Sequence, residues 1–284
     1  MEPPIDLRSR HEAWIATRER SLRDPEGWLA LVALHWLPVG QTILADSGPA
    51  GDDRLVLPGA LASPAAAFTL QSSGRLSVEI PSGVQASLDR QPLPPGTPAI
   101  MASDRESTAS VLRLGRLHIT HIHRQERAAL RVRDRQAPTL LRHQGVPRFD
   151  FDPALVVAAR FVPATQGTTV PITLITEHVE PHPVAGTLHF EIGGRPLSLL
   201  AQPSGDDLFV VFGDQTNRST KADGTYGGGR FLSVTRPDAQ GLTTIDFNRA
   251  VNPPCSFTPH ATCPTPPAAN RLPIPITAGE RRPS

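Results

Sequence analysis

A succession of short apolar runs, each ended by glycine, proline, serine or aspartate, constrains the fold of this chain most. Runs such as RLVLP, AFTLQ, RLSVEI and AALRVRD fill residues 53–134, and a second series from LVVAARFVPA to LTTIDFN fills residues 155–248. No long amphipathic helical pattern interrupts either series. The 31 prolines and 22 glycines are spread among the runs, which is typical of turns between strands. The pattern predicts an all-β fold of antiparallel sandwich or barrel type.

One helix is expected, at the N-terminus, over residues 6–24. Apolar side chains recur there at three- and four-residue steps, at Leu7, Trp14, Ile15 and Leu22. This spacing produces one apolar stripe along a helix. Asp6 is a suitable N-cap, and Pro25 ends the pattern.

The next run, LALVALHW, is apolar on both faces, so a buried strand and a short buried helix both fit. We favour a strand because Pro38 to Gly40 forms a turn signal. The following QTILA then reads as the returning strand.

A junction is expected at HQGVPRFDFDPA, which separates the two series of apolar runs. We predict two β-rich halves, residues 1–149 with the helix and a sandwich-like sheet arrangement, and residues 150–284. No flexible linker divides them. The strand rhythm of the first half is similar to that of forkhead-associated domains. It lacks their glycine–arginine entry and Ser-x-x-His, so phosphothreonine recognition is not implied.

Charge and hydropathy exclude several classes of partner. Lysine and arginine total 28 against 27 acidic residues, a formal charge of +1, which favours neither nucleic acid nor an anionic membrane surface. No run is long and apolar enough to cross a bilayer, and the first residues show no apolar leader. We therefore expect a cytoplasmic protein, in a compartment where cysteines stay reduced.

The stretch 244–280 contains the densest set of polar residues that core packing does not explain. If DFNRAVN is a strand, Asp246 and Asn248 project from one face, where they would orient a ligand or a metal-bound water. Alternatively, they satisfy backbone groups where Asn-Pro-Pro forces an abrupt exit. Asn252, Asn270 and Arg271 suit either role.

Cys255 and Cys263 lie eight positions apart in a proline-rich loop. Zinc would need two further ligands, and His260 is the only nearby imidazole, so no metal is predicted. A redox-sensitive disulfide and two inert buried thiols both remain open.

TYGGGRFLSV places three glycines before a strand, whereas phosphate-binding loops open a helix and carry Lys-Ser or Lys-Thr. The glycines are better explained by a tight turn or a close backbone approach. Arg230 would hold a carboxylate or phosphate, or would form a buried salt bridge to Asp214 or Asp246.

Two further clusters have simpler explanations beside the functional ones. Gly115, His121, His123 and Glu126 are arranged much like the first metal motif of cupins, but the glutamate is too close and no second motif follows. Arg131, Arg133 and Arg135 share one strand face, as an anion site or as a solvated face.

Several of these runs together resemble one family. DPEGWLALVALHWLPVGQ, ALRVRD, VFGD, TYGGGRFLSV and the stretch from DFNRAVNPPC to PITAGE occur in this order. In this they resemble the bacterial and archaeal family of domain of unknown function 1684 (DUF1684), over nearly the whole chain. The resemblance implies a shared fold and site and does not imply an activity. Arg133 falls within a family motif.

Two functions and a structural role follow from these residues. The first is binding of a small, anionic ligand in a C-terminal pocket lined by Tyr226, Arg230, Asp246, Asn248 and Arg249 and closed by the cysteine loop. The second is a hydrolase or isomerase with Asp246 as acid or base and Arg230 as charge stabiliser. The third is a structural lock. No cofactor, membrane or nucleic-acid partner is predicted, and the oligomeric state is left open.

Overall fold

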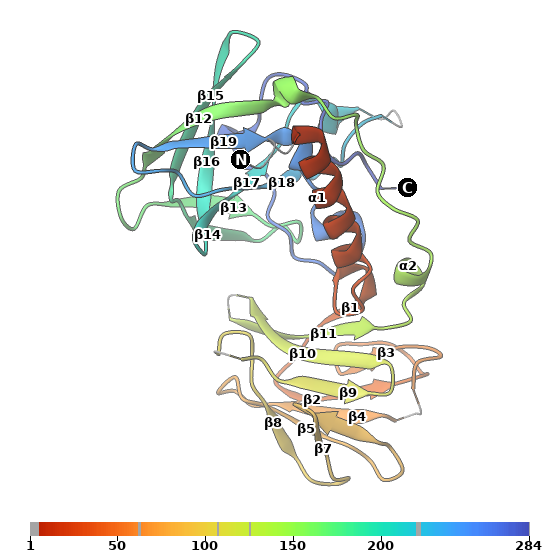
Figure 1. Ribbon diagram of the computed structural model, residues 1–284. Coiled ribbons are helices and arrows are strands. Elements are labelled where there is room, and N and C mark those ends of the chain that lie inside the picture. Colours follow the sequence, from red (N-terminus) through yellow and green to blue (C-terminus); the bar gives the residue numbers. More distant parts are fainter. Residues whose placement is uncertain (1–5, 62–63, 107, 125, 220–222, 284) are drawn as a thin grey trace. The chain divides into compact units, whose positions relative to one another are not determined.

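The computed structural model describes residues 6–61, 64–106, 108–124, 126–219 and 223–283, and its chain forms two compact units (Figure 1). The barrel unit consists of Met1–Ser21 and Gln144–Ser284, and the sandwich unit consists of Leu22–His143. The sequence predicts a boundary at residue 149, with the helix in the first half. In the structure, the helix belongs to the barrel unit, together with most of the second half.

Helix α1 spans Leu7–Leu22, so the predicted helix is confirmed. Its contacts explain why it belongs to the barrel unit: the His11 ring lies 5.0 Å from the Phe151 ring, and Arg18 pairs with Glu280. Leu7, the first residue of the predicted apolar stripe, is 47% exposed. Aromatic and charged contacts therefore hold the helix in the barrel unit, in addition to the packing of its partly buried apolar residues.

The sandwich unit contains two sheets face to face (Figure 1). One has the strand order β1-β11-β10-β9-β6-β7, and the other has the order β3-β2-β4-β5-β8. The bounds are β1 Leu31–Trp36, β2 Gly40–Ala45, β3 Arg54–Val56, β4 Ala66–Leu70, β5 Leu76–Glu79, β6 Ala86–Leu88, β7 Gln91–Pro92, β8 Ala99–Met101, β9 Val111–Leu114, β10 Leu117–Arg124 and β11 Arg127–Asp134. The buried core draws alternate residues from both sheets, such as Phe68 and Leu76 from one and Ile119 and Val132 from the other.

The first strand of this unit is confirmed, but its expected partner is wrong. LALVALHW begins as a short 3₁₀ turn, η1 at Trp28–Ala30, and continues as β1. β1 pairs with β11, whereas β2 pairs with β3 and β4 in the other sheet. The turn at Pro38 to Gly40 therefore crosses between two sheets, so QTILA does not return along its predecessor.

The barrel unit is built around one curled antiparallel sheet with the order β18-β17-β16-β15-β12-β19. Its bounds are β12 Val156–Pro163, β15 Gly186–Ile192, β16 Arg195–Ser204, β17 Asp207–Phe212, β18 Arg230–Val234 and β19 Leu242–Asp246, with a separate hairpin of β13 Thr169–Thr173 and β14 Val179–Pro183. Short helices are α2 Pro138–Leu141 in the sandwich unit and, in the barrel unit, η2 Pro153–Leu155, η3 Gln215–Arg218, η4 Phe247–Arg249, η5 Pro254–Ser256 and η6 Ala268–Asn270.

The curl makes this sheet a half-barrel. β16 pairs with β15 along its first seven residues and with β17 along its last three, so it bends between the two partners. The edge strands β18 and β19 thereby come into contact, around a core that includes Phe212, Leu232 and Ile245. The predicted all-β, antiparallel sandwich and barrel class is confirmed.

Strand directions define the two ends of the half-barrel. At the end we call the open end, β12, β16 and β18 finish while β15, β17 and β19 begin. At the other end, which we call the motif end, β17 and β19 finish and β12 and β18 begin. Across the described part of the chain, no helix is both long enough and apolar enough to traverse a membrane.

Candidate functional site

Arg230 begins β18 at the motif end and is completely buried. Its Nη2 lies 2.7 Å from Asp214 Oδ2 and also donates to the carbonyl of Ile276 at 2.8 Å, while Nη1 donates to the carbonyl of Ala278. Burial lowers the pKa of Arg230, and the Asp214 carboxylate opposes that shift. These contacts form the buried salt bridge that was one of the alternatives for this arginine.

The glycines before Arg230 allow a close backbone approach. Gly229 has φ +89°, and a Cβ there would lie 2.7 Å from the carbonyl oxygen of Phe212. Only glycine meets both conditions without strain. Asp214 is equally constrained, because it caps η3 and also accepts the backbone N–H of Ile276 at 3.2 Å.

Asp246 and Asn248 do come together, but the predicted strand geometry is wrong. β19 ends at Asp246, whose carboxylate caps the 3₁₀ turn η4 by accepting the backbone N–H of Asn248 at 3.0 Å. The Asn248 amide is 1% exposed and bonds the backbone N–H and carbonyl of Asp152, each at 2.9 Å. Arg249 pairs with Asp246 at 3.1 Å. These groups satisfy backbone atoms, which was the second interpretation of the pair.

Asn252 belongs to a buried charge network that the sequence analysis missed. Glu280 is completely buried and accepts hydrogen bonds from the backbone of Asn252 at 2.6 Å, Arg18 Nε at 2.9 Å and Arg148 Nη2 at 3.1 Å. The available signal was a glutamate closing the apolar run LPIPITA, where an acidic residue needs a buried partner. Its two arginine partners, Arg148 and Arg18, lie 132 and 262 positions away along the chain.

Asn270 has a purely structural environment. Its side-chain amide accepts the N–H of Leu200 at 2.7 Å and donates to the carbonyls of Leu200 and Val211 at 2.9 and 2.8 Å. The residue is 2% exposed. It ties the C-terminal segment to β16 and β17.

Tyr226, Cys255 and Cys263 lie close together. The backbone N–H of Cys255 lies 3.2 Å from Cys263 Sγ, and the Tyr226 hydroxyl donates to the Cys255 carbonyl at 3.3 Å. Hydrogen bonds from the Cys263 and Tyr226 side chains lower the pKa of the Cys255 thiol, against the opposing effect of burial. Burial raises the pKa of Tyr226. Neither cysteine forms a disulfide in the structure.

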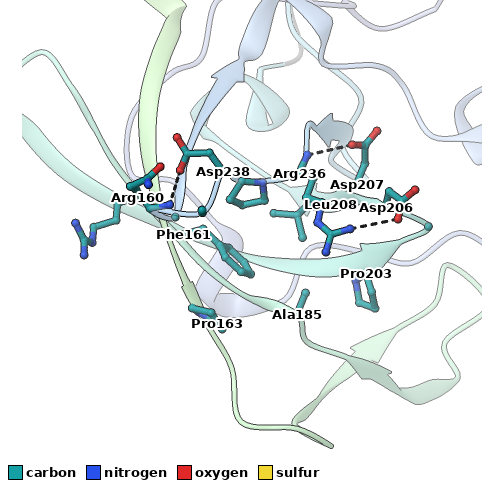
Figure 2. Close-up of a pocket in the computed structure, with 15 residues that line it drawn as sticks. Arg160, Phe161, Pro163, Ala185, Pro203, Asp206, Asp207, Leu208, Arg236 and Asp238 are labelled. Atoms are coloured by element: carbon teal, nitrogen blue, oxygen red, sulfur yellow. Dashed lines mark hydrogen bonds and ion pairs between the residues drawn. The ribbon is translucent and has the colours of Figure 1, made fainter.

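A cavity of about 620 Å³ lies at the open end of the half-barrel (Figure 2). Phe161 and Leu208 lie at its centre, with Pro163, Ala185 and Pro203 around them. Its charged residues are Arg160, Asp206, Asp207, Arg236 and Asp238. Figure 2 shows the Arg160 guanidinium directed away from the cavity. None of the predicted site residues lines it.

Arg271 lines a second, smaller cavity in the barrel unit. This space, about 360 Å³, is bounded by His189, Ser198, Leu197, Leu272 and neighbouring residues, with no carboxylate among them. Among the predicted site residues, Arg271 alone lines this cavity.

Arg133 belongs to the sandwich unit, whereas the other predicted site residues belong to the barrel unit. Burial lowers its pKa, while Glu26 and Asp24 counteract the shift. The imidazoles of His121 and His123 lie 4.6 Å apart in the same unit. Within the described ranges, no group of three or more His, Cys, Asp or Glu residues is arranged to hold a metal ion.

Comparisons with known proteins place the chain in a family. The family described as protein of unknown function (DUF1684) matches residues 142–281. The sequence analysis predicts a resemblance over nearly the whole chain. The match is shorter, and the runs before residue 142, including Arg133, lie outside it. A search of curated proteins found no match.

A solved structure is also similar. The solution NMR structure of an uncharacterised protein from gene locus rrnAC0354 of Haloarcula marismortui is 32% identical in sequence. The alignment covers 49% of this chain and 76% of that protein, with a TM-score of 0.39. On the family match, the chain belongs over residues 142–281 to the DUF1684 family of proteins of unknown function.

Proposed function

We propose that this protein binds a small organic ligand in the open-end cavity of the barrel unit, and that the ligand combines a flat apolar part with a positively charged end. The observation that carries the proposal is a cavity of about 620 Å³ with Phe161 and Leu208 at its centre and charged groups at its edge. Such volumes and linings are typical of small-molecule sites, which often occupy the mouths of β-barrels.

The charge at the cavity edge favours a cation. The edge of the cavity carries three carboxylates, those of Asp206, Asp207 and Asp238. It also carries one arginine whose side chain runs along the edge, Arg236. Arg236 Nη1 lies 3.3 Å from Asp206 Oδ1, and both side chains are mostly exposed. A ligand amine would therefore meet a net negative edge, where it can form charge-assisted hydrogen bonds.

The anionic ligand expected from the sequence fits a different place in the same unit. The cavity beside Arg271 is lined by a guanidinium, the His189 imidazole and the Ser198 hydroxyl, with no carboxylate. We keep this as the second candidate, for an anion smaller than the ligand of the open-end cavity.

The motif end supports a structural role better than catalysis. Arg230 is completely buried and paired with Asp214, and Asp246 is occupied by Asn248 and Arg249. An enzyme using Asp246 and Arg230 together would need a substrate to reach an arginine that has no exposed surface. For localisation we propose the cytoplasm, where the two cysteines, which form no disulfide in the structure, stay reduced.

The test uses two probes with the same apolar body and opposite charge, phenethylamine and 3-phenylpropionate. We expect phenethylamine to bind more tightly, by ligand-observed NMR titration. Ala185→Leu fills the open-end cavity and should abolish this binding. Ala158→Leu makes the same change at an exposed position of β12 and should leave it unchanged.

Two results would overturn the proposal: tighter binding of the carboxylate, or equal amine binding by both alanine variants. If 3-phenylpropionate binds and Arg271→Gln removes it, the second candidate is correct instead. Native mass spectrometry of the protein purified from its host, searching for a retained molecule, identifies the natural ligand.

A further inference from the structure

A third cavity, in the sandwich unit, has a strongly positive lining. It measures about 610 Å³, and we call it the basic cavity. Arg23, Arg116, Arg135 and His143 line it, together with Leu140 and Leu141. No aspartate or glutamate is among its lining residues. With the histidine neutral, three guanidinium groups therefore face one space.

Backbone contacts fix the turns that carry two of these arginines. Arg116 follows Gly115 in the hairpin between β9 and β10, where Gly115 has φ +55°. The backbone N–H of Arg135, which follows β11, donates to the carbonyl of Arg116 at 3.1 Å. The two residues are thus held next to each other by main-chain geometry that does not depend on a ligand.

The carboxylate of Asp134 is bonded to this framework. Asp134 is 5% exposed; its Oδ2 lies 2.9 Å from Arg116 Nε, and its Oδ1 accepts the backbone N–H of Gln136 at 2.8 Å. Asp134 therefore orients Arg116 and stabilises the turn. It offsets the positive charge of Arg116, as one carboxylate balances one guanidinium.

An apolar wall adjoins the arginines. Leu141 of helix α2 is 70% exposed, and Leu140 lies beside it in the same lining. These two side chains give the lining an apolar part beside the arginines. Guanidinium groups bind the paired oxygens of phosphate and carboxylate groups in a bidentate manner.

From this arrangement we infer that the basic cavity binds a small organic dianion, with its phosphate or dicarboxylate group on Arg23, Arg116 and Arg135 and its apolar part on Leu140 and Leu141. This site is separate from the open-end cavity and does not rest on the function proposed for it. The three arginines considered as one solvated face, Arg131, Arg133 and Arg135, therefore do not share one environment. Only Arg135 lines the basic cavity, whereas Arg131 stacks on Trp28 at 5.4 Å.

Isothermal titration calorimetry of the full-length protein at low ionic strength tests this inference, with phenyl phosphate and inorganic phosphate as probes. We expect saturable 1:1 binding of phenyl phosphate, weaker binding of inorganic phosphate, and a Kd for phenyl phosphate raised about tenfold by Arg135→Gln or Arg23→Gln. The control Arg75→Gln removes an exposed arginine of the same unit and should leave the Kd unchanged. Leu141→Ser should make the two probes bind alike.

Three results would contradict the site: no saturable binding below about 10 mM phenyl phosphate, equal weakening by Arg75→Gln and Arg135→Gln, or tighter binding of inorganic phosphate than of phenyl phosphate. The second result would show a diffuse effect of surface charge, which salt screens. Thermal unfolding of each variant checks that the unit is folded, and Arg23 and Arg135 provide two independent substitutions.

Discussion

Arg230 and Cys255 both lie in the segment matched by the family, and their surroundings lead to opposite chemical behaviour. Arg230 has no exposed surface, and its guanidinium is bonded to Asp214 and to two carbonyls. Cys255 is half-buried, and the side chains of Cys263 and Tyr226 lower the pKa of its thiol. The arginine is therefore a structural group, whereas the thiol ionises more readily than an ordinary cysteine.

The first prediction concerns the ionisation of Cys255. Hydrogen bonds from Cys263 and Tyr226 stabilise the thiolate and lower the pKa of Cys255. Alkylation of Cys255 by iodoacetamide should therefore reach its half-maximal rate at a lower pH than alkylation of an ordinary cysteine. Tyr226→Phe removes one donor, so the midpoint should move to higher pH. A midpoint that is unchanged in Tyr226→Phe would show that the hydroxyl does not act on the thiol.

The sequence indicates which polar residues make specific contacts better than it indicates what those contacts do. Asp246, Asn248, Asn252 and Asn270 were selected because polar side chains stand in an apolar run, and all four are engaged in polar contacts. Whether such contacts reach a ligand or the backbone depends on distant segments. Asn248 bonds Asp152, and Asn270 bonds Leu200. Local spacing contains no information about partners 70 or more positions away.

Among the elements, the loop from Cys255 to Cys263 leads to the clearest prediction, because it brings the two cysteines together. η5 and the following turn carry the chain from Cys255 to Cys263 and return it so that the Cys255 N–H lies 3.2 Å from Cys263 Sγ. Linear separation of eight residues did not determine this approach, because a proline-rich loop can extend or fold back. This approach is what a redox-sensitive disulfide between the two cysteines requires.

The second prediction follows from this loop. Treatment with diamide should form one intramolecular disulfide: the two thiols give up two electrons and two protons, the Cys255–Cys263 S–S bond forms, and diamide is reduced to the hydrazine. Both free thiols should disappear together, with a loss of two hydrogens in mass, and dithiothreitol should restore them. Cys255→Ser should leave Cys263 as a thiol in the monomer. Loss of the two thiols at unrelated rates, or disulfide-linked dimers alone, would disprove the proximity.

Strand patterns were predicted more reliably than strand partners. The runs RLVLP, AFTLQ and RLSVEI coincide with β3, β4 and β5 because alternation of apolar residues is a local property. β1 and β2 were wrongly paired because pairing depends on which sheet each strand joins. The open-end cavity could not be predicted either, since Phe161 and Leu208 come from two separate strand ends and Asp238 comes from a loop.

At the scale of the whole molecule, buried histidines connect stability to pH. The pKa values of His11, His118, His121, His123 and His260 are all lowered, and burial is the largest cause in each case. The folded chain therefore holds these imidazoles neutral at pH values where an unfolded imidazole, with a pKa of about 6.5, begins to take up protons. Stability should be present above that pKa and be lost as the pH falls below it.

The third prediction measures this linkage. The thermal midpoint should fall between pH 7.5 and pH 5.5, by about 2–4 °C for each kcal/mol of stability lost. His121→Phe removes one of the lowered groups, so its midpoint should depend less steeply on pH over the same range, whatever its absolute value. A midpoint that stays constant or rises on acidification would show that burial does not hold these imidazoles neutral.

The division of the chain into two units also bears on how the family is defined. The matched range, residues 142–281, coincides with the C-terminal part of the barrel unit, and helix α1 completes that unit through Arg18 and Glu280. The central claim at this scale is that the polar residues of the motif end form an internal lock and that ligands bind elsewhere.

Urea unfolding of Arg230→Ala and Asn248→Ala tests that claim most directly. Removing Arg230 leaves Asp214 buried and unpaired, which costs about 3–5 kcal/mol, and removing the Asn248 amide leaves two buried backbone groups of Asp152 unsatisfied, at about 1–3 kcal/mol each. The control Arg236→Ala breaks a pair that is 71% and 95% exposed and should cost less than about 1 kcal/mol. Losses of several kcal/mol in the first two variants and little in the control are the predicted result. Unfolding curves of Arg230→Ala and Asn248→Ala that match the control would contradict the lock and return these residues to a solvated pocket.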